Sequence, residues 1–273
     1  MPELPEVEVV RRQLQPQLAG AEIIAADAHW SNKFAPALDA VGTRVDGIAR
    51  RGKYLLFELD DGHELVAHLG MTGSFRIEEG HSGPPRCEDH GAYTRAVWAL
   101  GDGRRLVFDD TRRFGRLRVV DAGDYADIPT LHAMGPEPLS TDFTGASLHA
   151  AIRGRSRAIK TQLLSQRPVA GVGNIYADEA LFLAGIDPRS KRIGAQRCER
   201  LAECIKVVLS NGLENGGTTL RDYVDAEGGA GRNQHSLHAY GKGGEPCGTC
   251  SEPFSTVVLD GRTTTFCRNC QKR

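Results

Sequence analysis

Short apolar runs separated by polar turns fill the first half of the chain, a pattern typical of antiparallel strands. A helix is expected first, from Pro5 to about Leu18, because Val7, Val10 and Leu14 recur at helical spacing. Five strand-like segments follow, at Tyr54–Leu59, Glu64–Leu69, Ala96–Leu100, Arg105–Phe108 and Leu117–Val120. The pattern predicts an antiparallel β-sandwich domain with one N-terminal helix over residues 1–132.

The pattern changes at residues 133–142, where Gly135-Pro136-Glu137-Pro138 excludes regular structure and predicts an interdomain hinge. Apolar residues then recur at helical spacing, which predicts a helical domain over residues 143–236. Its helices are expected at Leu148–Arg153, Ile159–Gln166, Ile175–Leu183 and Gln196–Asn211. A separate tail follows at residues 237–273, so the expected fold class is α+β.

Four of the seven cysteines are paired by spacing in this tail. The two C-x2-C pairs are Cys247 with Cys250 and Cys267 with Cys270. Between the pairs, Thr256–Leu259 and Thr263–Phe266 read as strands joined by an Asp260-Gly261 turn. Four thiolates suit tetrahedral Zn²⁺ and leave no open coordination position. The spacing therefore predicts a β-ribbon held by one structural zinc ion.

Composition narrows the class of protein. The 273 residues are 40% hydrophobic and 25% charged, with a net charge of −1, as in soluble globular proteins. No apolar stretch has the length of a membrane span, so no membrane partner is expected. The acidic, proline-bearing start lacks the basic and apolar regions of a signal peptide. A cytoplasmic location follows as an expectation, and thiols there favour metal binding over disulfides.

Basic residues are concentrated in two runs although the net charge is near zero. The run Arg153–Arg167 contains five basic residues and no acidic one, and Arg104–Arg118 contains six basic residues against two acidic ones. Either run alone fits a solvated face, but two in one near-neutral protein favour a basic groove for nucleic acid. The turn Gly171-Val172-Gly173 adds backbone N–H groups suited to phosphate, before a helix that Asn174 is expected to cap.

The start of the chain offers a nucleophile. Removal of Met1 would leave Pro2 with a secondary amine, and an ordinary α-amino group, with a pKa of about 7.7–8.0, is partly unprotonated at neutral pH. Attack of such an amine on a sugar C1′ gives a cationic iminium, which is an electron sink for elimination. Glu3 could deliver or accept the protons. Most prolines at position 2 have no such role, so motifs elsewhere in the chain must show whether Pro2 is a nucleophile.

Motifs along the whole chain resemble those of the formamidopyrimidine-DNA glycosylases, in the same order. They are Met1–Glu8 (MPELPEVE), Arg51–Leu55 (RGKYL), His68–Ser74 (HLGMTGS), Asp110–Gly115 (DTRRFG), Gly135–Leu139 (GPEPL), Gly171–Tyr176 (GVGNIY), Gly216–Leu220 (GGTTL) and the cysteine tail. The resemblance implies a bifunctional enzyme that excises oxidised purines, 8-oxoguanine and formamidopyrimidines, from double-stranded DNA and then cuts the abasic site by β- and δ-elimination. It also implies a helix-two-turn-helix domain, monomeric action on the nucleoid, and no nucleotide cofactor.

The resemblance assigns chemical roles to four residues. Pro2 would be the Schiff-base nucleophile, and Glu3 the acid that helps to open the sugar. Lys53 would contact DNA and assist proton transfer. Arg262, on the zinc ribbon, would contact phosphate and assist the final elimination.

The resemblance implies DNA contacts at six further positions, Met71, Tyr93, Arg112, Phe114, Arg155 and Asn174. Met71, Arg112 and Phe114 would fill the space left by an extruded base, which offsets the cost of flipping it. Arg112 would also pair with the orphaned base, normally cytosine. Arg155 and Asn174 would contact phosphates. Tyr93 stands where the family commonly has a DNA-contacting histidine, and His90 lies three residues before it.

A second departure from the family bears on the choice of lesion. Arg232-Asn233 replaces the aromatic pair usual in the loop that covers the flipped base, which bears on a preference for 8-oxoguanine. One alternative is an enzyme similar to endonuclease VIII that acts on oxidised pyrimidines, although Leu4 stands where that branch typically has glycine. The other is a non-catalytic DNA-binding paralogue, which would not need Pro2, Glu3 or Lys53.

Overall fold

The computed structural model describes all 273 residues, which form two compact units. The first unit comprises Met1–Ile128 and Asn215–Arg232, and the second comprises Pro129–Glu214 and Asn233–Arg273. The sequence-based boundaries put the hinge at residues 133–142 and ran the helical domain to residue 236, whereas the structure places Asn215–Arg232 with the strands. The α+β class is confirmed, with antiparallel sheets in one unit and helices with a small ribbon in the other.

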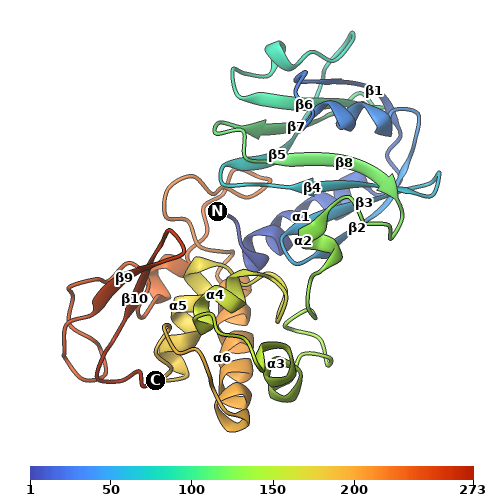
Figure 1. Cartoon of the computed structure of the whole chain (residues 1–273). Helices are drawn as coiled ribbons and strands as arrows, with labels where there is room; N and C mark the ends of the chain where they lie inside the picture. The colour runs from blue at the N-terminus through green and yellow to red at the C-terminus, as the bar shows by residue number, and fades with distance from the viewer. The chain divides into compact units, whose positions relative to one another are not determined.

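Two four-stranded antiparallel sheets make up most of the first unit (Figure 1). One sheet has the order β1 (Ile23–Ala28), β6 (Thr94–Leu100), β7 (Arg105–Asp110) and β5 (Gly73–Glu78). The other has the order β2 (Val45–Arg51), β3 (Tyr54–Leu59), β4 (His63–His68) and β8 (Arg116–Asp121). Two 3-10 helices, η1 (Ala35–Ala40) and η2 (Cys87–Asp89), lie in the connections. Side chains of both sheets, Phe57 and Trp98 among them, belong to one hydrophobic core.

Helix α1 (Leu4–Leu18) contributes the predicted apolar stripe to that core. Val7, Val10 and Leu14 are fully buried or nearly so. Pro5 falls in the first turn, where a backbone N–H is not needed for the helix. The helix thus ties the start of the chain to the sandwich, and the chemistry-bearing residues Pro2 and Glu3 directly precede it.

The segment Asn215–Arg232 completes the first unit although it follows the helices in sequence. The N–H of Thr218 donates to Glu6 Oε1 at 2.7 Å, and that of Ala226 donates to Gln13 Oε1 at 2.9 Å. Tyr223 belongs to the core of the sandwich. The residues of α1 are therefore held on one side by a segment more than 200 positions away.

The second unit holds the remaining helices and the ribbon. Its helices are α2 (Pro129–His132), α3 (Gly145–Ile152), α4 (Ile159–Leu164), α5 (Asn174–Leu183), α6 (Ala195–Glu214) and the 3-10 helix η3 (Asn233–Ser236). The predicted ribbon is present as β9 (Ser255–Leu259) and β10 (Arg262–Phe266), joined at Asp260-Gly261 with positive φ at both turn residues. None of the helices has the length and apolar character to cross a membrane.

A buried charge pair joins α4, α5 and the ribbon. Lys160 Nζ lies 2.6 Å from Asp178 Oδ1, and both side chains are fully buried. Lys160 also donates to Thr264 Oγ1 at 2.9 Å, while the backbone N–H of Thr265 donates to Asp178 Oδ2 at 2.9 Å. The helices and β10 are thus held together by charged groups whose hydrogen bonds offset the cost of their burial.

Candidate active site and zinc ribbon

Pro2 and Glu3 are buried at the beginning of α1. Only 2% of Glu3 is exposed, and its N–H donates to Glu6 Oε2 at 2.7 Å. Because Glu6 binds the head of the helix with one oxygen and Thr218 with the other, its carboxylate fixes the first residues against the segment Asn215–Arg232. The backbone that carries the two residues is therefore held in place by groups of the same unit.

Lys53 lies in the two-residue turn between β2 and β3. Gly52 occupies the first turn position with φ of 56°, which suits glycine in a hairpin of this length. Arg50 Nη1 donates to the Gly52 carbonyl at 3.0 Å and its Nε donates to Glu8 of α1, also at 3.0 Å. Burial raises the pKa of Glu8, but hydrogen bonds from arginines lower it to about 2, so the carboxylate stays charged. The buried Lys53 is thus presented by a turn anchored to α1.

His68, at the end of β4, is a candidate site residue that the sequence indicated only as part of a motif. The N–H of Gly70 donates to its Nδ1 at 3.0 Å, which leaves the proton of the neutral ring on Nε2. Burial and the charges of Lys53 and Arg116 lower the pKa of His68 to about 4. A neutral N–H donor therefore stands near Lys53 at neutral pH. Only the fold, which brings this strand end beside the hairpin, could reveal it.

Two exposed loops carry the side chains expected to fill an emptied base position. Met71 and Phe114, both large apolar side chains, are 36% and 48% exposed. The guanidinium of Arg112 lies 5.0 Å from the centre of the Phe114 ring, within cation–π range. A Cβ at Gly70 would collide with the backbone of Phe114, so glycine allows the two loops to touch. The structure therefore brings Met71, Arg112 and Phe114 to adjacent loops, all open to solvent.

Tyr93 and His90 differ in their surroundings. Tyr93 is 55% exposed and lines a hollow of about 680 Å³ together with Arg112. The ring of His90 is 2% exposed, and its Nδ1 lies 2.6 Å from Glu78 Oε2. Tyr93 is thus free to face a ligand in this hollow, whereas His90 points its Nδ1 at a carboxylate of its own unit.

The Arg232-Asn233 pair is divided between the two units. Arg232 is exposed, and its N–H donates to the Asn215 carbonyl at 2.9 Å within the first unit. Asn233 is 4% exposed and begins η3 in the second unit. Of the two residues that replace the family's aromatic pair, only Arg232 presents its side chain to solvent.

Asn174 does not cap α5, so that expectation was wrong. Gly173 occupies the N-cap position, and Asn174 is the first helical residue. Its side-chain Nδ2 instead donates to the Thr263 carbonyl on β10 at 3.3 Å. Because Thr263 directly follows Arg262, the structure brings Asn174 close to the ribbon residue expected to contact phosphate. Arg262 itself is exposed at the start of β10.

Gln166 shapes the glycine turn before α5 and was not singled out from the sequence. It lies two residues after the end of α4 and adopts the left-handed region, with φ of 63°. Its side-chain Oε1 accepts from the Gly171 N–H at 2.8 Å, and its Nε2 donates to the Val172 carbonyl at 2.7 Å. A buried amide side chain that satisfies both backbone groups holds the turn open. Nothing in the sequence around Gln166, between Ser165 and Arg167, indicates such a role.

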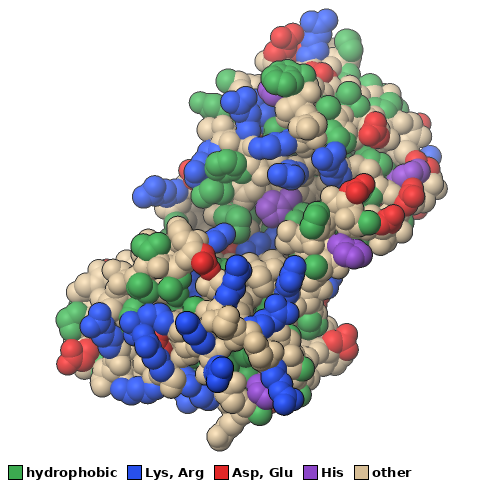
Figure 2. All heavy atoms as spheres, in the orientation of Figure 1, with side chains coloured by type: hydrophobic (Ala, Val, Ile, Leu, Met, Phe, Trp, Pro, Cys, Tyr) green, Lys and Arg blue, Asp and Glu red, His purple; other side chains and the backbone are tan.

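Exposed cations of the second unit include the basic run that follows α3. Arg153, Arg155 and Arg157 are all exposed in the turn after α3. Arg155 Nε donates to the Ala151 carbonyl at 2.7 Å, which fixes its side chain at the end of that helix. Figure 2 shows Lys and Arg side chains gathered on one face over the helices and the ribbon. Such a surface attracts a polyanion even when the net charge of the chain is near zero.

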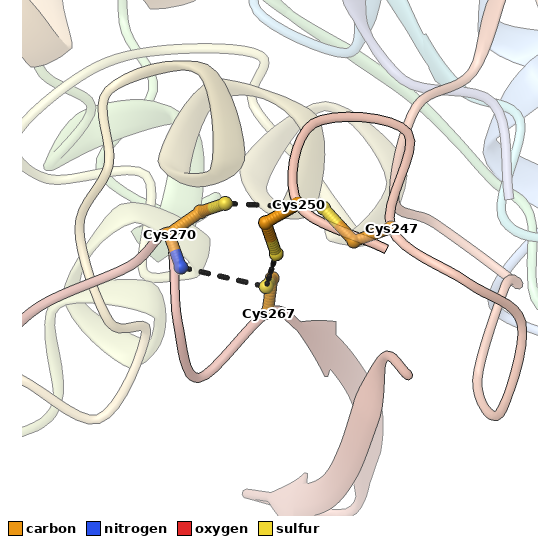
Figure 3. Close-up of side chains that lie close together, drawn as sticks. All are labelled: Cys247, Cys250, Cys267 and Cys270. Atoms are coloured by element: carbon orange, nitrogen blue, oxygen red, sulfur yellow. Dashed lines mark hydrogen bonds between the residues drawn. The ribbon is translucent and has the colours of Figure 1, made fainter. Parts of the chain in front are cut away.

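The four tail cysteines form one cluster (Figure 3). Their sulfur atoms all lie within 4.8 Å of one another. Cys247 Sγ lies 3.9 Å from Cys270 Sγ, and Cys250 Sγ lies 3.5 Å from Cys267 Sγ. Sulfurs bound to zinc at about 2.3 Å in a tetrahedron stand about 3.8 Å apart, so the cluster fits one Zn²⁺ ion. Cys87, Cys198 and Cys204 lie outside it.

Comparison with known families accounts for nearly the whole chain. Residues 1–117 match the formamidopyrimidine-DNA glycosylase N-terminal domain, and residues 134–224 match the H2TH domain of the same enzymes. Residues 244–273 match the zinc finger found in FPG and IleRS. The cysteine cluster is therefore a zinc finger of a known type, as its spacing predicted.

Individual relatives match over their full length. A formamidopyrimidine-DNA glycosylase of Deinococcus radiodurans is 45% identical and covers 99% of this chain and 97% of its own. One of Rhodopseudomonas palustris is 43% identical over all of both chains. The crystal structure of the MutM (FPG) protein from Thermus thermophilus superposes with a TM-score of 0.90 at 43% identity, covering 99% of this chain and 98% of the other. A Lactococcus lactis Fpg in complex with DNA containing an abasic site gives 0.87 at 33% identity, covering 99% and 100%. The chain belongs to the formamidopyrimidine-DNA glycosylase family.

Proposed function

We propose that this protein is a bifunctional DNA glycosylase and abasic-site lyase that removes oxidised purines from double-stranded DNA. The observation that carries the proposal is that Pro2, Glu3, Lys53 and Arg262 all stand in a chain that matches this family from end to end. The exposed Met71 and Phe114 and the basic surface of the second unit support a DNA substrate. We assign this activity to the cytoplasm, on the nucleoid, and to a single copy of the chain.

The first chemical step uses the N-terminal amine. After removal of Met1, the nitrogen of Pro2 attacks the sugar C1′ while the bond from C1′ to the base breaks and the base leaves with a proton. Glu3 protonates the ring oxygen of the sugar as the ring opens. Because a secondary amine gives an iminium without an N–H, the intermediate carries a fixed positive charge.

The second step uses that charge. Loss of a proton from C2′ expels the 3′-phosphate, and a further proton loss expels the 5′-phosphate, so the strand is cut on both sides of the sugar. Lys53 assists the proton transfers, and Arg262 binds the phosphate that leaves. Water then hydrolyses the iminium and frees Pro2. The zinc ion, held by four sulfurs, supplies only the rigidity of the ribbon that carries Arg262.

Extrusion of the lesion is assigned to the exposed loops. Met71 and Phe114 replace the stacking that the flipped nucleotide loses, at a cost of a few kcal/mol that their burial in the duplex offsets. Arg112 contacts the base left opposite. Arg155 and Asn174 hold phosphates from the second unit, and Tyr93 contacts DNA at the rim of its hollow.

Borohydride trapping on two duplexes tests the proposal, one with 8-oxoguanine opposite cytosine and one with an abasic site. We expect a covalent adduct on both duplexes and, for Pro2→Gly, no adduct with binding largely retained. A chain with one residue inserted between Met1 and Pro2 is the matched control, because it keeps every side chain and removes only the terminal secondary amine. Intact mass establishes that Met1 is absent from the active protein.

The outcomes separate the alternatives. An adduct on the abasic duplex alone, together with excision of an oxidised pyrimidine, would replace the purine assignment by the endonuclease VIII-like one. No adduct on either duplex, with Pro2 confirmed as the first residue, would leave a DNA-binding protein without catalysis. Trapping that survives in the chain with the inserted residue would overturn the nucleophile, because that chain has no terminal amine at the position of Pro2.

A further inference from the structure

Three side chains of metal-binding type meet in the first unit, which does not contain the cysteine cluster. Glu78 ends β5, His81 follows three residues later, and His90 lies near the end of the same loop. One ligand atom of each lies within 4.8 Å of the other two. We propose that Glu78, His81 and His90 form a second metal site, which binds one zinc ion.

The donor set suits that ion. Two imidazole nitrogens and one carboxylate oxygen are ordinary zinc ligands, and three protein ligands leave the fourth tetrahedral position to water. Carboxylates bind zinc in their ionised form and imidazoles in their neutral form.

The two oxygens of Glu78 have separate partners. Oε2 lies 2.6 Å from His90 Nδ1 and 2.9 Å from His81 Nε2. Oε1 accepts from Arg76, at 2.8 Å from Nε and 2.6 Å from Nη2. Arg76 thus orients the carboxylate through one oxygen and leaves the other toward the two imidazoles. Hydrogen bonds of this kind hold the ligands of established metal sites.

The geometry needs only a small adjustment. Ligand atoms at 2.0–2.2 Å from a tetrahedral zinc ion stand about 3.3–3.5 Å apart, so the contacts to Oε2 must lengthen by less than about 1 Å. The rings of His81 and His90 already lie close together, with 4.9 Å between their centres and 52° between their planes. Both histidines lie in the loop between β5 and β6, outside the strand ladders.

Charge nearby is balanced enough to admit the ion. The guanidinium of Arg76 would repel it, but the same guanidinium also pairs with the carboxylate of Asp109. His90 and Arg76 both line the hollow that Tyr93 borders. The metal would join the two ends of the loop and fix the wall of that hollow.

Zinc stoichiometry tests it on the full-length protein without an affinity tag. After equilibration in buffered micromolar free zinc, we expect two zinc ions per chain for the wild type and one for His81→Ala and His90→Ala. His63→Ala is the matched control, because His63 also lies beside carboxylates, those of Asp61 and Asp121, on another hairpin. It should retain two ions.

Cobalt in place of zinc identifies which site is lost. Four thiolates give intense charge-transfer absorption, which two imidazoles and a carboxylate do not, so the histidine variants should lose cobalt without losing that absorption. Retained thiolate absorption also shows that the variants are folded at the ribbon. One zinc per chain in the wild type would overturn the proposal, as would two in both histidine variants.

Discussion

The hydroxyl of Thr72, in the loop before β5, donates at 2.5 Å to Oδ1 of Asp110, the last residue of β7. Asp110 is fully buried, and its other oxygen accepts from the Gly115 N–H at 2.6 Å. Thr72 Oγ1 in turn accepts from the Arg112 N–H at 3.1 Å. One carboxylate thus fixes the loop that carries Met71 to the loop that carries Arg112 and Phe114.

Asp110→Asn should therefore disorder both loops. The asparagine amide has one acceptor oxygen for two donors, the Thr72 hydroxyl and the Gly115 N–H. Its own N–H₂ faces one of these donors, so a buried polar group loses its partner. Such a loss costs about 1–3 kcal/mol of unfolding free energy. We expect a larger fall in affinity for an abasic-site duplex than for undamaged DNA. Denaturant unfolding and binding titrations measure the two effects.

Asp121→Asn is the control for this change. Its side chain is 80% exposed at the end of β8, so its effect on unfolding should stay within about 0.5 kcal/mol. If Asp110→Asn and Asp121→Asn had the same free energy of unfolding, the role of the buried carboxylate would be contradicted.

His68 should make stability depend on pH. Its pKa is lowered to about 4 in the folded chain, below the ordinary value of 6.5, because burial and nearby cations oppose protonation. The unfolded chain therefore binds more protons below pH 6.5, so the contribution is complete above that pH and is lost as pH falls toward 4. His68→Asn keeps an acceptor for the Gly70 N–H. It should remove the fall in unfolding free energy, on the order of 3 kcal/mol, that His68 causes as pH falls from 6.5 to 4.

Carbon or nitrogen NMR of the imidazoles checks the titration directly. A signal of His68 that titrates near pH 6.5, or an unchanged pH profile in His68→Asn, would show that the ring is not held neutral by its surroundings.

Removal of zinc should unfold the ribbon and leave the sandwich intact. Structural zinc contributes about 10–16 kcal/mol to the folding of small fingers, and β9 and β10 form a sheet of two strands only. In Cys267→Ser we expect loss of the thiolate-bound zinc and of amide protection in β9 and β10, with protection in the first unit unchanged. Hydrogen exchange followed by mass spectrometry resolves the segments. Cys204→Ser, which alters a thiol outside the cluster, should keep the zinc and the protection.

Lys160→Met should destabilise the second unit strongly. The change leaves the fully buried carboxylate of Asp178 without its counter-ion, which costs about 3–5 kcal/mol. The double variant Lys160→Met with Asp178→Leu removes both charges and should recover most of that loss. Thermal and denaturant unfolding measure both. A double variant as unstable as the single one would mean that packing, and not the unpaired charge, sets the cost.

Local patterns were enough for much of the fold. The cysteine spacing predicted the zinc finger, and the Asp260-Gly261 pair predicted its turn, because both depend on residues close in sequence. The five strands named from alternation are present. The strands β1, β2 and β5 were not named, since their apolar residues are interrupted by glycine or charged residues that the sheet context tolerates.

Long-range pairing set the limit of sequence reasoning. Nothing near Thr218 shows that its N–H binds Glu6, so Asn215–Arg232 was placed with the helices. The pairing of His90 with Glu78 likewise depends on a loop that folds back on β5. For Asn174, the propensity for N-caps gave the wrong position by one residue, because the side chain finds a partner on the ribbon instead. The assigned roles of Pro2 and Arg262 stay predictions.

The return of Asn215–Arg232 to the sandwich has a consequence for synthesis of the chain. The polypeptide crosses between the units after Ile128, after Glu214 and after Arg232, so no single linker separates them. A ribosome has made about four-fifths of the protein before Thr218 and Tyr223 can take their places beside α1. The N-terminal residues are synthesised first, but their packing is completed only near the end of synthesis. A truncation after residue 128 would therefore expose part of the core of the first unit.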